Sequence, residues 1–506
     1  MLLTGDGYRD SLRRYAPCVF VNGVRVDSVA DSAALAPGIN AIAVTYDFAH
    51  DPRHRDLMTV PDPVSGRLVN RMTALDRTSA DLLAKLEAVR LVCRESGCAQ
   101  RYLTKDAANG IFQATFRADA NHGTQYHQRF LAYLDRVQTE DLTLGIAMTD
   151  AKGDRSKRPG AQANPDVYVH ISARRTDGIV IRGTKAIVTA APYVHEFLVM
   201  PCRTMTPEDA DFAVCCAVPV DAPGVTIVAR PAGRPGEPSA TFSGRYGQST
   251  GAVIFEDVFV PWERVFLAGE VDEGGLLTTS YATHHRHSCI AARAGFGDLL
   301  IGASALMVEA NGLDPERHAH IRDAMVELIT ITEGFYACGV AASVYPTTDP
   351  SGVAMPDPVF ANIGKLLLAT KIYDMHRLAH QVSGGLIVAL PGPDEDHNPE
   401  TQASLTAVLG GREDIPAAQR LEVARLLEDV SASYTGSWYS LISLHGGGSP
   451  EAMKREIWRN YPLPERREMV AQLIERGVLD RGQRASSQPG RCCAAGCEAS
   501  ETHSHE

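Results

Sequence analysis

The hydrophobic pattern of the chain changes twice along its length, from helical to strand-like and back to helical. Residues 78–118 carry apolar side chains at helical spacing behind a Thr/Ser/Asp start. From about Asp166, short β-branched segments follow, and Thr176-Asp177-Gly178 is a hairpin turn signal. After about Leu276 the spacing is helical again. This order disfavours a doubly wound α/β fold, in which strands and helices alternate element by element.

We therefore predict an α+β protein whose helices and strands are segregated along the chain. The length of 506 residues agrees with this, at roughly 150 residues per domain. The C-terminal tail is rich in small and polar residues, which predicts disorder. The predicted regions are residues 1–145 (N-terminal helical domain), 146–275 (central β domain), 276–480 (C-terminal helical bundle) and 481–506 (disordered tail containing Cys and His).

The charge balance is acidic, with 49 Lys and Arg against 61 Asp and Glu and a net charge of −12. Nucleic acid and anionic membranes are bound by basic surfaces, so we expect neither as a partner. No run approaches the ~18 apolar residues of a membrane span, and the N-terminal segment is too polar for a signal peptide. We expect a soluble, cytoplasmic protein.

The chain has 11 cysteines, and without a secretion signal they are not expected to form a disulfide scaffold. They leave open a metal or iron–sulfur site, a nucleophile, or small buried side chains. Cys93 and Cys98 lie in a predicted helix at a C-x4-C spacing, which is unusual for zinc or iron–sulfur loops. We interpret this pair as two packed thiols.

Residues 283–302 contain His284, His285 and His287, with Cys289 close by. Imidazole and thiol groups suit zinc or iron ligation and acid–base chemistry. At helical spacing, His284 and His287 share a face, whereas His285 points elsewhere. The alternative is that one or two of these histidines are structural.

Residues 147–159 form a basic, Gly-containing loop suited to an anionic cofactor, although a solvated loop has the same composition. The loop is neither a Walker loop nor a Rossmann fingerprint. Gly-rich turns at residues 383–385 and 445–449 follow helical patterns, so each suits either a helix C-cap or close approach of a cofactor. We find no nucleophile elbow, His-Glu-x-x-His zinc helix or kinase signature.

At AMTDAKGDRSKRP followed by NPDVYVHISARRTDGIVIRGTKA, the chain resembles the flavin family of 4-hydroxyphenylacetate 3-monooxygenases and 4-hydroxybutyryl-CoA dehydratases. GINAIAVTYDFAHDP, QVSGGLIVALP and SLHGGGSPEA extend the resemblance. It implies the acyl-CoA dehydrogenase-like architecture, with an N-terminal helical domain, a central β-barrel and a C-terminal helical bundle. It also implies a homotetramer that holds FAD between the domains and a neighbouring subunit.

The chain is more similar overall to the dehydratase branch, in which three Cys and one His hold a [4Fe–4S] cluster. Cys98 and His285 match two of those ligands, but Tyr102 and Ala292 occupy the other two positions. Because each iron needs its own donor, we predict no metal. The catalytic Glu and Tyr of that branch correspond to Ile442 and Cys289.

The monooxygenase branch is matched only in part. Its phenol-binding Arg and Tyr fall near Leu103 and Ala107, and its His before the flavin loop falls near Ile146. The resemblance therefore implies a flavin enzyme with a remodelled pocket, and 4-hydroxyphenylacetate itself is not the expected substrate.

Our leading hypothesis is a two-component monooxygenase that uses FADH2 from a separate flavin reductase, together with O2, to hydroxylate an aromatic or similarly electron-rich small molecule. The lack of a recognisable NAD(P)H fingerprint fits flavin delivered from outside. His285 is the first catalytic candidate, followed by Arg101 and Tyr102. The cofactor-binding candidates are Met148, Thr149, Arg155, Ser156, Thr189, Gln381, Ser383, Gly384 and Gly385.

Two alternatives stay open. One is an FAD-dependent acyl-CoA dehydratase or isomerase that works without the cluster, with His285 as the base. The other is a flavin-binding scaffold or sensor without catalysis.

Overall fold

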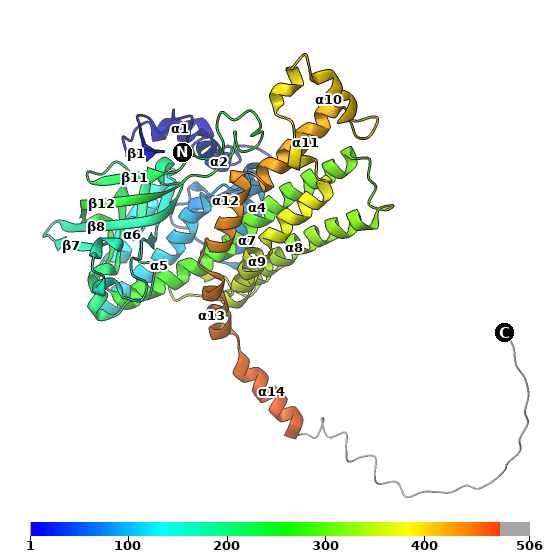
Figure 1. Cartoon of the computed structure of the whole chain (residues 1–506). Helices are drawn as coiled ribbons and strands as arrows, with labels where there is room; N and C mark the ends of the chain where they lie inside the picture. Colours follow the sequence, from blue (N-terminus) through cyan, green and yellow to red (C-terminus); the bar gives the residue numbers. More distant parts are fainter. Residues whose placement is uncertain (1, 476–506) are drawn as a thin grey trace, which may run out of the picture. The chain divides into compact units, whose positions relative to one another are not determined.

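The computed structural model describes residues 2–475 and shows mainly helices, then strands, then helices, in the order that the sequence predicts (Figure 1). The predicted N-terminal helical region departs from this pattern, because its residues 18–21 and 24–26 are strands that join the seven-stranded sheet. Residues 1–458 form one compact unit and a second begins at Arg459. The two predicted boundaries within the first unit, after residues 145 and 275, stay predictions, and the predicted tail at 481–506 lies outside the described residues. The N-terminal helices are α1 (Gly5–Leu12), α2 (Ala36–Asp47), α3 (Arg55–Met58), α4 (Ser79–Ser96), α5 (Tyr102–His122) and α6 (Tyr126–Thr139).

The connection between α4 and α5 corrects one prediction. Helix α4 begins with a capping box, in which the Thr78 side chain and the Asp81 carboxylate each accept a backbone N–H. It ends before Gly97, whose φ of 69° lies in the left-handed region. Cys98 therefore lies outside the helix that was predicted to contain both Cys93 and Cys98, because the glycine breaks that helix in two.

The strands form two larger sheets. The seven-stranded sheet has the order β2-β1-β11-β12-β8-β6, with β7 also paired to β8, and the four-stranded sheet has the order β13-β10-β9-β5. The rings of Phe197 and Phe255, one from each sheet, pack edge to face at 6.4 Å. The strand pairings among residues 2–475 do not show the closed barrel that was expected. The bounds are β1 (Cys18–Val21), β2 (Val24–Val26), β5 (Leu144–Ala147), β6 (Thr149–Asp150), β7 (His170–Arg174), β8 (Gly178–Thr189), β9 (Glu196–Val199), β10 (Val214–Pro219), β11 (Val225–Ala229), β12 (Thr250–Pro261) and β13 (Val265–Ala268).

Local turns behave as the sequence predicts at two places. Strands β7 and β8 form the hairpin around Thr176-Asp177-Gly178. The helix that ends at Ser383 is capped by Gly384 in the left-handed conformation. Two further hairpins pair β3 (Thr59–Pro61) with β4 (Leu68–Asn70), and β14 (Thr347–Thr348) with β15 (Ala354–Met355).

The 40-residue helix α7 (Val271–Ala310) is the axis of the helical part and packs against α4, α5, α8 and α9 (Figure 1). Small residues along it, such as Gly295 and Gly297, let neighbouring helices approach closely. The other helices are α8 (Ala319–Val344), α9 (Pro358–Ser383), α10 (Gln402–Val408), α11 (Ala417–Ser431), α12 (Tyr434–His445), α13 (Pro450–Asn460) and α14 (Leu463–Glu475).

By length and composition alone, α7 and α8 are each apolar enough to cross a membrane. The buried core helix of a globular protein has the same composition, and 61% of the apolar window of α7 is buried within the chain, against 28% for α8. The expectation of a protein without a membrane partner stays a prediction.

Replacing Gly295 by Ala should lower the free energy of unfolding by about 2 kcal/mol, because an added Cβ would overpack the contact between α7 and α4. That Cβ would lie 2.5 Å from the Arg90 carbonyl oxygen and 2.8 Å from the Arg94 nitrogen. Gly302→Ala, on the same helix, is the matched control. Its Cβ would meet nothing within 4 Å, so it should leave stability unchanged or raise it by up to about 1 kcal/mol. Urea unfolding of both variants checks this, and equal losses would contradict it.

Candidate active site

A cysteine, a histidine and an aspartate meet where α7 crosses α5, and we call Cys289, His285 and Asp106 the thiol triad. The Cys289 Sγ lies 3.5 Å from the His285 Nε2. The other ring nitrogen, Nδ1, lies 3.5 Å from the Asp106 Oδ2. Cys289 and His285 are one helical turn apart on α7, so their spacing alone brings them together, whereas Asp106 comes from α5.

Aromatic rings enclose the imidazole of His285. The Tyr281 ring stacks on it with centroids 5.4 Å apart, and the Tyr102 ring lies parallel at 6.3 Å. Tyr102 and Asp106 are buried, but Cys289 and the His285 ring are partly exposed. An incoming ligand would therefore meet the thiol and the imidazole first, with tyrosine rings as walls.

Buried cations face Cys289 on the side of the Gly-rich turn after α12. The Lys365 ammonium donates to the Ser443 carbonyl at 2.6 Å, and the Arg286 guanidinium donates to the Gly447 carbonyl at 2.9 Å. A Cβ on Gly447, whose φ is 77°, would lie 3.4 to 3.6 Å from His285, Arg286 and Lys365. The glycine thus lets the turn pack directly on these three side chains.

The charges of the triad support one another. Burial opposes ionisation of His285, but the negative charges of Cys289 and Asp106 raise its pKa to about 9. Burial likewise opposes the thiolate of Cys289, yet the His285 imidazolium and the Lys365 ammonium lower its pKa. Burial lowers the pKa of Lys365 to about 8. At neutral pH the His285 ring is therefore protonated and is a hydrogen-bond donor, and the lowered pKa of Cys289 favours its thiolate.

A second thiol site adjoins the triad and occupies the region of the cluster ligands. The Arg293 guanidinium donates to the Cys98 Sγ at 3.3 Å, and Gln248 donates to the Cys98 carbonyl oxygen. A hydrogen bond from Cys93, together with Arg293, lowers the pKa of Cys98 to about 6. Arg293 also lies over the Tyr439 ring, 5.3 Å from its centroid.

These residues do not fit a [4Fe–4S] cluster. The Arg293 guanidinium contacts the buried Cys98 sulfur, and the positions that the resemblance matches to the two other thiolate ligands hold Tyr102 and Ala292. Within residues 2–475, no group of three or more His, Cys, Asp or Glu side chains is arranged to hold a metal ion.

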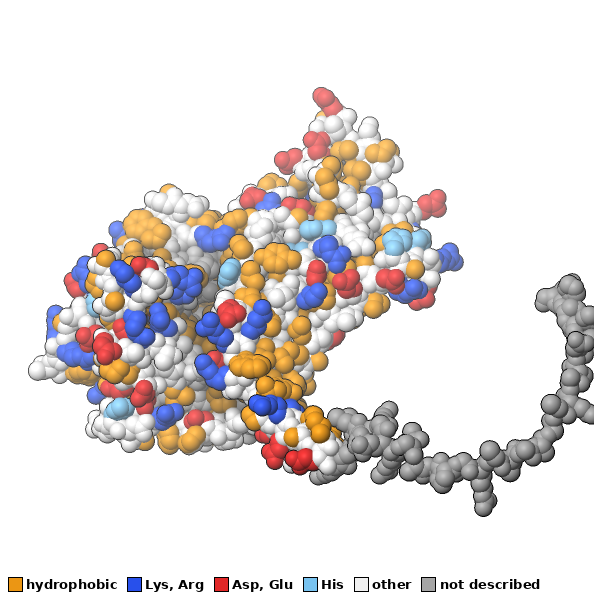
Figure 2. Space-filling view, turned by 60° about the horizontal axis from the view of Figure 1, so that its bottom comes forward, with side chains coloured by type: hydrophobic (Ala, Val, Ile, Leu, Met, Phe, Trp, Pro, Cys, Tyr) orange, Lys and Arg blue, Asp and Glu red, His pale blue; other side chains and the backbone are white. Residues whose placement is uncertain are grey.

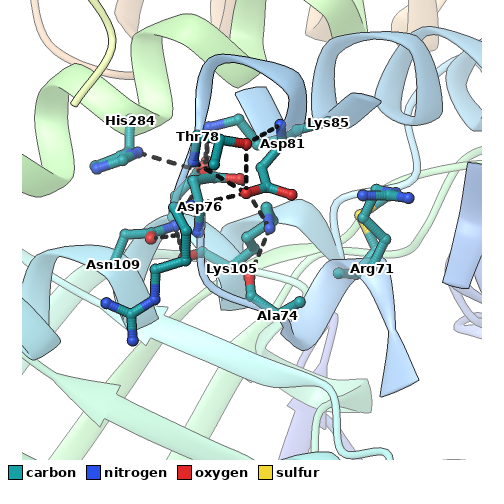
Figure 3. A network of polar contacts seen from close by, with 12 residues as sticks. Arg71, Ala74, Asp76, Thr78, Asp81, Lys85, Lys105, Asn109 and His284 are labelled. Carbon is teal, nitrogen blue, oxygen red and sulfur yellow. Dashed lines mark hydrogen bonds and ion pairs between the residues drawn. The ribbon is translucent and has the colours of Figure 1, made fainter. Parts of the chain in front are cut away.

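A buried ion-pair network lies behind the triad, between α4, α5 and α7 (Figure 3). The Asp76 carboxylate forms ion pairs with the Lys85 ammonium at 3.2 Å and with the Lys105 ammonium at 2.9 Å. Lys85 also lies 3.5 Å from Asp106, which links the network to the triad. The His284 Nδ1 lies 3.7 Å from Asp76, and burial lowers the pKa of His284 to about 3. His284 is thus a neutral core group. This agrees with the alternative that one or two of the three histidines are structural.

The predicted catalytic residues separate into two places. His285 and Tyr102 lie together, as the sequence suggested. Arg101 instead donates to the Asp141 side chain at 2.5 Å and lies over the Tyr46 ring at 3.8 Å. It is fully buried, and these contacts are outside the triad, so the structure gives Arg101 a packing role.

The predicted cofactor residues of the strand region lie on neighbouring strands. Thr149 of β6 pairs with Ile187 of β8, and Thr189 ends the same strand β8. The Met148 carbonyl accepts from the Lys185 ammonium at 3.0 Å, which fixes the start of the loop. Arg155 and Ser156 follow on an exposed loop, where Ser156 Oγ donates to Asp154. The Thr149 and Thr189 side chains are partly open to a ligand.

The remaining cofactor candidates lie at the C-terminal end of α9, in the helical part. Gln381, Gly384 and Gly385 are exposed, while Ser383 is buried and donates to the His380 carbonyl. A groove of about 540 Å³ runs beside them, lined by Tyr373, His376, Arg377, His380, Ser431, Ser437, Ser440 and Leu441. Among residues 2–475, no hydrogen bond or strand pairing joins this set to Thr149 and Thr189, and the joint role of the two sets stays a prediction.

Several site residues were not predicted from the sequence. The pairing of Cys289 with His285 was visible as a four-residue spacing in a helical segment. Asp106, Arg293 and Lys365 had no such signal, because they come from different helices and only the fold brings them together.

Comparison with known proteins places this site in a family. The model of the 4-hydroxyphenylacetate 3-hydroxylase N-terminal domain matches residues 4–267, and that of its C-terminal domain matches residues 275–475. The chain therefore belongs to the 4-hydroxyphenylacetate 3-hydroxylase family, which confirms the resemblance.

The relatives are enzymes of two kinds. The chain is 34% identical to the 4-hydroxybutyryl-CoA dehydratase/vinylacetyl-CoA-Δ-isomerase of Clostridium aminobutyricum, over 93% of this chain and 99% of that protein. Among solved structures, an oxygen-tolerant archaeal 4-hydroxybutyryl-CoA dehydratase from N. maritimus has a TM-score of 0.90 and 32% identity, covering 94% of this chain and 95% of that one. The oxygenase component of a 4-hydroxyphenylacetate 3-monooxygenase complexed with FAD has a TM-score of 0.83 and 22% identity, covering 95% and 100%. The fold is shared with both kinds.

Proposed function

We propose that this chain is a reduced-flavin-dependent monooxygenase that hydroxylates an aromatic or similarly electron-rich small molecule. The observation that carries the proposal is the contact of His285 with the stacked rings of Tyr281 and Tyr102 at the partly exposed end of the triad. The raised pKa of His285 makes its ring a charged donor at neutral pH. An imidazolium donates a hydrogen bond to a phenolic oxygen that gains negative charge, and tyrosine rings pack against an aromatic substrate.

The cofactor we propose is FAD, bound as FADH2. Reduced FAD supplies the activation of O2 in such a reaction. Met148, Thr149 and Thr189 would hold its ring end on β6 and β8, and the loop with Arg155 and Ser156 would meet more polar parts. The position of β6 at the edge of its sheet supports this fit. Figure 2 shows that Lys and Arg side chains also gather around a hollow on one face of the molecule.

The second set of flavin contacts would come from another subunit. Gln381, Ser383, Gly384 and Gly385 lie at the end of α9, and a Cβ on Gly385 would meet nothing within 4 Å. That open glycine face suits close approach by a ligand. We therefore propose a cytoplasmic homotetramer in which the two sets meet across subunits, supplied by a separate reductase.

The residues of the chain would act as follows. His285 donates to the substrate oxygen, and Asp106 orients the imidazole through Nδ1. Tyr281 and Tyr102 flank the substrate and exclude water. The network of Asp76, Lys85 and Lys105 holds Asp106 in place from behind.

The second candidate is a cluster-free acyl-CoA dehydratase or isomerase. The 34% identity to the Clostridium enzyme favours it. Two observations oppose it: the cluster positions are occupied by Tyr102, Ala292 and the guanidinium of Arg293, and a His285 that is protonated at neutral pH is a poor base.

One experiment separates the two candidates. The protein is purified without oxygen, iron and sulfide are assayed, and FADH2, a panel of phenols and ¹⁸O-labelled O2 are then added. We expect no stoichiometric iron or sulfide and one labelled oxygen atom in a hydroxylated product. A stoichiometric cluster, or isomerisation of crotonyl-type CoA esters without any oxygenated product, would overturn the monooxygenase proposal.

Replacing His285 by Gln should lower the rate of product formation about 100-fold, because the charged donor to the substrate oxygen is lost. His320→Gln is the control, since His320 is exposed on α8. The rates of labelled product for the two variants give the comparison. Equal rates would remove the role proposed for His285.

A further inference from the structure

We propose that the thiol triad is a nucleophilic acyl-transfer site, in which Cys289 takes the acyl group of a thioester and holds it as an acyl-cysteine. This goes beyond the proposed hydroxylation, because the step needs neither flavin nor O2. It assigns a chemical role to a residue that the hydroxylation leaves unused.

The geometry is that of an activated nucleophile. The Cys289 Sγ lies 3.5 Å from the His285 Nε2 and 3.9 Å from Nδ1, and Nδ1 also lies 3.5 Å from the Asp106 Oδ2. Asp106 is itself fixed, because it accepts from Ser288 at 2.7 Å and lies 3.5 Å from Lys85. A thiol, an imidazole that stabilises its thiolate and an orienting carboxylate are the arrangement that cysteine acyl-transfer enzymes need.

The exposure of the triad increases from the carboxylate to the thiol, as a nucleophilic cysteine requires. Asp106 is fully buried, the His285 side chain is 12% exposed, and Cys289 is partly exposed. The carboxylate is thus shielded from water while the sulfur is reachable. Cys93 and Cys98, by contrast, are fully buried, so a reagent from solution would meet Cys289 before it meets either of them.

Cations surround the place where negative charge would develop. Lys365 and Arg286 face His285 across Gly447, and both act electrostatically on Cys289. When a thiolate adds to a carbonyl, the oxygen becomes an oxyanion, which nearby buried cations stabilise. The cations that hold the thiolate before the reaction would therefore hold the oxyanion during it.

The step balances without an oxidant or reductant. The Cys289 thiolate attacks the thioester carbonyl carbon and forms a new carbon–sulfur bond. The tetrahedral adduct collapses, the original carbon–sulfur bond breaks, and the carrier thiolate leaves with the electron pair. His285 gives its Nε2 proton to that thiolate, so the products are acyl-Cys289, neutral His285 and a free carrier thiol.

Other uses of these groups fit the structure less well. Metal binding is opposed because His285 and Cys98 are already engaged with Asp106 and Arg293, and no metal-holding group is formed within the described part of the chain. A structural thiol needs no imidazole or carboxylate beside it. Cys338, which only donates to the Gly334 carbonyl of its own helix, is such a thiol.

The thioester would be carried on coenzyme A or on the phosphopantetheine arm of a carrier protein, and both present the same acyl–sulfur bond. The test incubates the complete protein, in air and without added reduced flavin, with butyryl-CoA and separately with butyryl-phosphopantetheine. We expect one butyryl group per chain, mapped to Cys289 by peptide mass spectrometry, with release of an equal amount of free thiol. If only butyryl-CoA labels the protein, the carrier that the site recognises is coenzyme A. If both compounds label it, the site recognises the phosphopantetheine arm that they share.

Variants sharpen the result. His285→Gln should slow labelling about 100-fold and Asp106→Asn about 10-fold, because the thiolate loses its ion partner or that partner loses its orientation. Cys338→Ser is the matched control and should label like the unaltered protein. Absence of a butyryl adduct on Cys289, or equal labelling of Cys289 and Cys338 in the unaltered protein, would overturn the proposal even if a variant fails to fold. Because no reduced flavin is added, this failure is distinct from failure of the hydroxylation test.

Discussion

Replacing Asp76 by Ala should lower the free energy of unfolding by about 3 to 5 kcal/mol, since it leaves buried cations without their partner. Asp76 is fully buried and lies 3.2 Å from Lys85 and 2.9 Å from Lys105. Burial alone would raise the pKa of its carboxyl group, but the two ammonium groups hold that pKa well below its usual range. Without Asp76, both lysines must share Asp106, lose their charge or admit water.

Urea unfolding at neutral pH measures this loss. Asp31→Ala is the control, because Asp31 forms its ion pair with Arg13 at the surface and screening by water weakens that contact. A double variant, Asp76→Ala with Lys105→Met, should recover part of the stability by removing one orphaned charge. A loss in Asp76→Ala no larger than that in Asp31→Ala would contradict a buried, charged network.

The Asp76 variant also tests how the network reaches the site. Lys85 bridges Asp76 and Asp106, so a freed Lys85 should draw closer to Asp106 and weaken its contact with His285. Titration of the His285 ring by NMR should then show a pKa below the value of about 9 that the intact triad supports.

Much of the fold could be predicted because it depends on local patterns. The sequence places the switch to strand-like spacing at about Asp166 and the return of helical spacing at about Leu276, whereas β5 begins at Leu144 and α7 at Val271. The break at Gly97 was missed, because a glycine inside a helical pattern is tolerated as often as it ends a helix. The arrangement of the strands into two sheets depends on long-range pairing, which periodicity does not encode.

The site could be predicted only where it lies on one helix. His285 and Cys289 are four residues apart, and Tyr281 is four residues before His285, so one face of α7 supplies three of its groups. Asp106 and Lys365 reach the same point from α5 and α9, and a single sequence gives no reason to pair them. Arg101 shows the opposite case: it is next to Tyr102 in the sequence, yet its side chain contacts Asp141 and Tyr46 and not the triad.

The second large expected effect is a loss of folding stability at acidic pH. Stability should fall by about 3 kcal/mol as the pH drops from about 6.5 to about 4, through the titration of His195 alone. Burial lowers the pKa of His195 to about 4 in the folded chain, whereas an exposed histidine titrates near 6.5. Between these values the unfolded chain binds a proton that the folded chain does not, so lowering the pH favours unfolding. Above about 6.5 both states are neutral and this contribution is constant.

The contacts of His195 explain its preference for the neutral form. The Thr143 backbone N–H donates to Nδ1 at 2.9 Å, so Nδ1 carries no proton, and Nε2 lies 2.7 Å from the Ser11 hydroxyl. A second ring proton, on Nδ1, would face the Thr143 backbone N–H, so that two hydrogen-bond donors would point at each other. In His195→Gln the amide can accept from Thr143 and donate to Ser11 without titrating, so unfolding in urea should depend less steeply on pH. The exposed variant His320→Gln should keep the full slope, and an unchanged slope in His195→Gln would show that another group controls the acid sensitivity.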